Sequence, residues 1–164
     1  MRQKIFLIIL LLVQGGFWGC GFLGEKEISR PAVVTLKTRQ FALSDTAFIR
    51  QTGESVTVQL YTAGALAYEI YLGRTACVND NCMDAQSFNA LYLSSEYPPD
   101  LMGQVFRRER LRGLEGLTER LDGAGFVQQA TVKGAYAITY RVTQNEVLFK
   151  DLDNHLIIRI KELP

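Results

Sequence analysis

Residues 135–163 read AYAITYRVTQNEVLFKDLDNHLIIRIKEL, and this stretch decides the fold class. Apolar and polar side chains alternate within the runs 135–142, 147–150 and 156–163. This period of two residues is typical of β-strands that bury one face. The connecting sequences 143–145 and 152–154 are short and polar, so the three strands are predicted to lie antiparallel.

The same alternation recurs elsewhere in the chain. It predicts a strand at 126–132 and a pair at 55–61 and 66–72, and residues 62–65 join this pair as a hairpin. Strands are also predicted at 33–37 and 41–48. Strands therefore dominate both halves of the chain.

The middle of the chain has helical spacing instead. Helices are predicted at 85–93 and 98–108, and Pro98 and Pro99 suit the start of the second. A third helical spacing joins Leu111, Leu114, Leu117 and Leu121. Because an apolar sheet face must be covered, we expect an α+β fold. The expected sheet is antiparallel and curved into an open half-barrel, and two or three helices cover it.

The N-terminus has the layout of a secretory signal. Arg2 and Lys4 precede the apolar run 5–13, and Gly19-Cys20 follows. This segment resembles a bacterial lipoprotein signal, which implies cleavage before Cys20 and lipid attachment to it. An uncleaved anchor and ordinary secretion are the alternatives. Residues 1–19 are then the signal peptide, residues 20–31 a lipidated tether, and residues 32–164 a single domain.

The expected location is the outer membrane, facing the periplasm, because Gly21 stands where an Asp would favour inner-membrane retention. The chain has 18 Lys and Arg against 17 Asp and Glu, so no charge excess favours nucleic acid as a partner. One histidine and three cysteines exclude multi-Cys/His zinc frameworks. We expect neither a metal nor a cofactor.

Cys77 and Cys82 flank Val78-Asn79-Asp80-Asn81, a sequence that favours a turn. In an oxidising periplasm this pair is predicted to form a disulfide. Free thiols are the alternative.

Catalytic residues are not evident. There is no G-x-S-x-G elbow, phosphate loop or dinucleotide fingerprint. Asp100, Glu109 and Asp122 could in principle pair for glycoside hydrolysis, but their spacing suits helix caps and surface charges equally well. We therefore expect a protein that is not an enzyme.

An apolar, aromatic-rich interior is expected where the sheet meets the helices. It is either a filled core or a cavity for an acyl chain. The candidate cavity-lining residues are Tyr68, Ile70, Leu101, Val105, Phe106, Phe126, Tyr136, Ile138, Tyr140 and Phe149.

The element order over residues 47–163 resembles the family of periplasmic lipoprotein carriers and outer-membrane lipoprotein receptors, LolA and LolB. The likeness includes Tyr136-x-x-x-Tyr140, Phe149-Lys150-Asp151-x-x-Asn154 and the alternating last strand. The resemblance implies an open half-barrel with a helical plug that binds the acyl chains of lipoproteins.

The resemblance also implies a membrane contact at the hairpin loop, at Ala63, Gly64 and Leu66. The receptors carry a protruding Leu just before the loop glycine, and this chain has Ala63 there. The expected function is therefore LolB-like lipoprotein localisation, with the membrane and other lipoproteins as partners. The alternative is a structural or adaptor lipoprotein with a filled core that binds another envelope protein.

Overall fold

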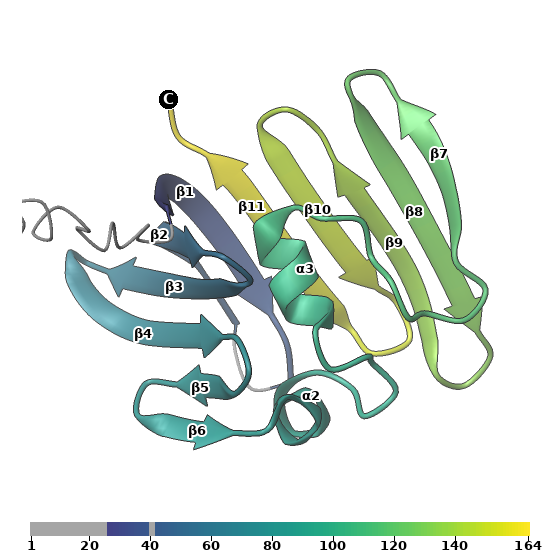
Figure 1. Ribbon diagram of the computed structural model, residues 1–164, viewed down its shortest axis with the longest axis horizontal. Coiled ribbons are helices and arrows are strands. Elements are labelled where there is room, and N and C mark those ends of the chain that lie inside the picture. Colours follow the sequence, from purple (N-terminus) through teal and green to yellow (C-terminus); the bar gives the residue numbers. More distant parts are fainter. Residues whose placement is uncertain (1–25, 40–41) are drawn as a thin grey trace, which may run out of the picture.

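The computed structural model describes residues 26–39 and 42–164. These residues form one antiparallel sheet with the strand order β6-β5-β4-β3-β2-β1-β11-β10-β9-β8-β7 (Figure 1). The strands are β1 (Glu27–Lys37), β2 (Ala42–Thr52), β3 (Ser55–Thr62), β4 (Ala65–Leu72), β5 (Ala76–Val78), β6 (Asn81–Met83), β7 (Thr118–Asp122), β8 (Gly125–Val132), β9 (Tyr136–Val142), β10 (Glu146–Asp151) and β11 (Leu156–Glu162). The sheet is open, and β6 and β7 are its edges.

Two short helices, α2 (Ala85–Tyr92) and α3 (Leu101–Arg107), lie between β6 and β7 in the sequence. Figure 1 shows α3 in front of β10 and β11, and α2 near β5 and β6. All seven residues of α3 are buried, whereas α2 buries only Phe88 and Asn89. The N-terminus of α2 is capped by Asp84, whose carboxylate accepts a hydrogen bond from the Ser87 N–H at 2.9 Å.

The core lies on one face of the sheet, which we call the inner face. Alternate residues of the strands are buried there, as in β1, where Ala32, Val34 and Leu36 are buried and their neighbours are not. The helices and the loops around them cover this face, and Leu93, Tyr97, Leu111 and Leu114 belong to the same core cluster. Burial of alternate side chains is what the sequence pattern predicts for strands such as β3, β9 and β11.

The expectation of an α+β fold, a sheet covered by two or three helices, is wrong. Eleven strands dominate the described residues, and the two helices have only eight and seven residues. Helices of two turns cannot cover so wide a sheet, so irregular loops supply much of the cover. The fold is mostly β, with one open antiparallel sheet.

The helix predicted from the spacing of Leu111 to Leu121 is also absent. Residues 108–117 form an irregular loop, and Leu121 lies in the edge strand β7. Gly113 and Gly116 have φ values of +79° and +67°, which an α-helix does not contain. Leu111 and Leu114 are nevertheless buried, so the apolar spacing reflects a loop that packs on the sheet.

Strand β1 begins at Glu27, inside the segment 20–31 that the sequence assigns to a tether. Pro31 lies within β1, and its carbonyl accepts from the Leu163 N–H at 3.1 Å. The pairing with β11 begins one residue later, at Ala32. The missing N–H of Pro31 therefore falls just beyond the β11 ladder, where proline is tolerated.

Candidate functional site

Nine of the ten predicted cavity-lining residues are buried in the core, and Tyr68 is partly buried against it. The structure brings residues of both halves of the chain together under α3. Tyr140 is central to the aromatic part, with ring centroids 5.8 Å from Phe126 and 6.2 Å from Phe149. The Phe149 ring in turn lies 6.2 Å from Tyr97, in an edge-to-face arrangement.

A narrow opening between the helices and the sheet, which we call the apolar crevice, reaches toward this interior. Its lining residues are Leu36, Thr38, Ile70, Phe88, Tyr92, Leu93, Met102 and Phe106. Its volume is about 10 Å³, close to the least space that one water molecule needs. The apolar crevice is therefore too small for an acyl chain, which could enter there only if its walls moved apart.

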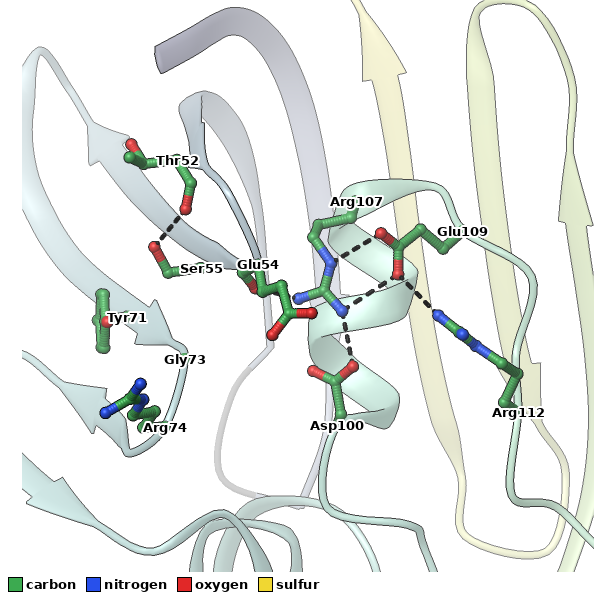
Figure 2. Close-up of a pocket in the computed structure, with 10 residues that line it drawn as sticks. All are labelled: Thr52, Glu54, Ser55, Tyr71, Gly73, Arg74, Asp100, Arg107, Glu109 and Arg112. Atoms are coloured by element: carbon green, nitrogen blue, oxygen red, sulfur yellow. Dashed lines mark hydrogen bonds and ion pairs between the residues drawn. The ribbon is translucent and has the colours of Figure 1, made fainter. Parts of the chain in front are cut away.

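A second, larger opening is polar. This polar cleft has a volume of about 740 Å³ and lies between α3, the β2–β3 turn and the loop after β4 (Figure 2). It is lined by three arginines and three acidic residues, Arg74, Arg107, Arg112, Glu54, Asp100 and Glu109, together with Thr52, Ser55, Tyr71 and Gly73. Because these positive and negative side chains balance, the polar cleft favours neither anionic nor cationic ligands.

Arg107 organises the α3 side of the polar cleft. Its side chain is 4% exposed and pairs with Asp100 at 2.6 Å and with Glu109 at 3.1 Å. It also donates to the Glu54 backbone oxygen at 2.5 Å, which connects α3 to the β2–β3 turn. Burial alone would lower the pKa of Arg107, but the hydrogen bonds to Glu109 and Asp100 raise it overall. Asp100 and Glu109 are two of the three carboxylates considered for glycoside hydrolysis, and both thus pair with Arg107.

Gly103 lies within α3, between the side chains of Asp100 and Arg107. A Cβ added at Gly103 would lie 2.3 Å from Asp100 Oδ1 and 2.6 Å from an Arg107 nitrogen. The side chains of Asp100 and Arg107 therefore meet across Gly103, and a Cβ there would displace the ends of both.

A second group of polar contacts holds the C-terminal end of α3. Arg30 of β1 donates to the Phe106 backbone oxygen at 3.1 Å and pairs with Glu162 of β11 at 3.3 Å. Arg108, which ends α3 in a left-handed conformation, pairs with the same carboxylate at 2.5 Å. Arg108 also donates to the Gln144 backbone oxygen at 2.7 Å. Side chains of β1 and β11 and the turn between β9 and β10 thus connect to this helix end.

A buried carboxylate holds the loop that precedes α3. Asp151 is 1% exposed and accepts from the Tyr97 hydroxyl, from the Asn154 amide at 2.7 Å, and from the N–H groups of Ala137 and Asp153 at 2.9 and 3.0 Å. Burial, and then the nearby Asp151, raise the pKa of Tyr97. Asp151 and Asn154 stand in the sequence motif quoted above, but the pattern gave no signal for Tyr97.

The β3–β4 hairpin ends in the candidate membrane contact. Ala63 and Gly64 have φ values of +52° and +82°, which a two-residue type I′ turn requires. Residues 63–67 are all exposed and carry no charge, and half of the Leu66 surface is open. The hairpin tip thus presents a small apolar surface to the outside.

Cys77 and Cys82 form a disulfide, with a Cα–Cα distance of 4.0 Å. The two residues pair directly across β5 and β6, one edge of the sheet. This bond, together with the Asp84 cap, fixes the chain immediately before α2.

Cys20, the predicted lipid attachment site, lies outside the described residues. Among residues 26–39 and 42–164, no helix has the length and apolar character that a bilayer span needs. The same residues contain no group of three His, Cys, Asp or Glu side chains that could hold a metal ion. Comparison with protein-family models and with curated proteins finds no match.

Proposed function

We propose that this chain is a lipid-anchored protein of the bacterial envelope that binds acyl chains, in the manner of LolB-like lipoprotein receptors. The acyl chains would belong to other lipoproteins and would lie between the inner face of the sheet and the two helices. The work is done by burial of apolar surface, without covalent chemistry, metal or cofactor. The observation that supports this most is the one-sided sheet, whose apolar inner face lies beneath helices of two turns.

The helices are the elements that can move. Polar side-chain contacts hold both ends of α3, through Asp100, Arg107, Arg30 and Arg108. Helix α2 is mostly exposed and lies on the rim of the apolar crevice. An exposed element such as α2 opens at a lower free energy than the buried strands of a sheet. A shift of α2 or α3 would widen the apolar crevice into a groove along the inner face.

The energetics are sufficient for binding. Each buried methylene contributes about 0.8 kcal/mol, so a chain of about a dozen methylenes contributes on the order of 10 kcal/mol. Loss of ligand freedom and displacement of a helix offset part of this.

The anchor and the hairpin tip complete the proposal. Acyl chains on Cys20 would hold the domain at the outer membrane, facing the periplasm. The apolar tip at Ala63, Gly64 and Leu66 would contact the same membrane. Both are consistent with delivery of a bound lipoprotein into that bilayer.

One observation favours the adaptor alternative. The apolar crevice has a volume of only about 10 Å³, so the core is filled in this structure. If the helices do not move, the domain would be a structural lipoprotein that binds another envelope protein.

Titration of a fluorescent acyl ester, methyl cis-parinarate, into a soluble chain starting at residue 21 separates these functions. We expect saturable binding by the unaltered sequence. Met102→Trp should weaken binding at least tenfold, because Met102 lines the apolar crevice and indole would fill it. The measured quantity is the dissociation constant from probe fluorescence.

Leu121→Trp is the control, because Leu121 is 76% exposed on the edge strand β7. It adds the same indole away from the crevice and should leave the dissociation constant unchanged. Circular dichroism confirms that both variants fold. An unaltered chain that does not bind the probe saturably would favour the adaptor.

A further inference from the structure

Three tyrosines of the core differ in what their hydroxyl groups contact. The Tyr97 hydroxyl donates to Asp151. The Tyr136 hydroxyl accepts from the Glu115 N–H at 2.9 Å and contacts the Glu115 carbonyl at 3.4 Å. The Tyr140 hydroxyl has no hydrogen-bond partner within the described part of the chain, although its residue is 0% exposed.

An unpaired buried hydroxyl is unfavourable for folding, because it gives up its hydrogen bonds to water. The ring contacts of Tyr140 with Phe126 and Phe149 need no hydroxyl, so phenylalanine would serve the packing equally well. Burial raises the pKa of Tyr140, so the group stays protonated and can donate. Within residues 26–39 and 42–164, the Tyr140 hydroxyl is thus a buried donor that the fold itself does not use.

Tyr140 is also placed where a ligand would lie under the proposed function. It belongs to β9, on the inner face, in the cluster that contains Leu101, Val105 and Phe106 of α3. Movement of α3 would expose this wall of the interior. The hydroxyl would then lie in a mostly apolar wall, opposite Gln128 of β8, whose buried side chain is already hydrogen-bonded to Leu111 and Glu119.

We propose that the Tyr140 hydroxyl donates a hydrogen bond to the carbonyl oxygen of an ester or amide at the head of a bound acyl chain. This inference rests on the proposed function and names its ligand class: acyl esters and amides are preferred over bare hydrocarbons of the same length. A neutral carbonyl suits this position, because burying a carboxylate is costly and the charged groups that act on Tyr140, Arg108 and Glu109, are already paired with Glu162 and Arg107. A site with a buried donor also discriminates against ligands that lack the acceptor.

Competition binding tests this directly. The soluble chain is loaded with the hydrocarbon probe diphenylhexatriene, which is displaced by methyl laurate or by tridecane. Tyr140→Phe should weaken methyl laurate binding about fivefold, which is about 1 kcal/mol at 1.4 kcal/mol per tenfold. Tridecane binding should not change. Tyr140→Phe should also melt at or above the temperature of the unaltered chain, because it removes only an unpaired group.

Tyr136→Phe is the matched control on the same strand. Because its hydroxyl is paired with the Glu115 backbone, this variant should melt at a lower temperature than the unaltered chain, in contrast to Tyr140→Phe. If methyl laurate displaces the probe equally well from Tyr140→Phe and from the unaltered chain, the inference about Tyr140 is overturned. The proposed function would still stand. A lowered melting temperature of Tyr140→Phe would also overturn the inference, since the hydroxyl would then have a partner in the folded protein. An unaltered chain that binds no apolar ligand would overturn the proposed function together with it.

Discussion

Replacing Asp151 with alanine is expected to lower the free energy of unfolding by about 4 kcal/mol. The carboxylate is buried, and it accepts from the Tyr97 hydroxyl, the Asn154 amide and the N–H groups of Ala137 and Asp153. Alanine would leave these donors without an acceptor, and each buried unpaired donor costs about 1–3 kcal/mol before relaxation. Equilibrium unfolding in urea, with the disulfide intact, measures the change.

Asp153→Ala is the matched control, because Asp153 is exposed and contributes only its backbone N–H to the network. Its effect should stay within about 0.5 kcal/mol. Asp151→Asn should fall between the two, since its amide oxygen can still accept from two N–H groups. A loss below about 1 kcal/mol for Asp151→Ala would show that this network does not hold the loop before α3.

Arg107→Leu is expected to lower the free energy of unfolding by about 2 kcal/mol. The guanidinium is almost fully buried, and it pairs with Asp100 and Glu109 and donates to the Glu54 carbonyl. Breaking a fully buried pair costs about 3–5 kcal/mol, but here both carboxylates are partly exposed and can be rehydrated. The effect is therefore smaller, and urea unfolding measures it.

Arg112→Leu serves as the comparison. Its side chain is 75% exposed, and its single ion pair with Glu109 spans 3.7 Å. Exposed pairs of this kind contribute about 0–1 kcal/mol. Equal effects of Arg107→Leu and Arg112→Leu would contradict the role assigned to Arg107 in holding α3 to the β2–β3 turn.

The strands were the predictable part of this fold. The alternation in residues 55–72 and 135–163 predicted β3, β4, β9, β10 and β11, because each strand buries one face. The same reasoning failed at residues 111–121, where leucines at helical spacing belong to a loop and an edge strand. Apolar spacing reports which side chains are buried, and the positive φ values of Gly113 and Gly116 decide the backbone.

The polar contacts around α3 were not predictable from the sequence. Tyr97 and Asp151 are 54 positions apart, as are Arg108 and Glu162. No local pattern marks such pairs, because only the folded sheet brings them together. Arg107 and Arg108 lie in a run of alternating charges, a pattern typical of a solvated helix face. The structure instead buries Arg107. Its hydrogen bond to the Glu54 carbonyl joins residues far apart in the sequence, so no local pattern predicts it.

The central claim is that acyl chains bind between the inner face and the helices, and photo-crosslinking tests it most directly. The soluble chain is irradiated with a methyl ester of a fatty acid that carries a diazirine in its chain, and labelled residues are identified by mass spectrometry. We predict labels on α3 and on inner-face residues, such as Met102, Phe106 and Ile138, that an excess of unlabelled ester suppresses. Labels confined to the exposed hairpin tip or to the opposite face of the sheet would contradict the account.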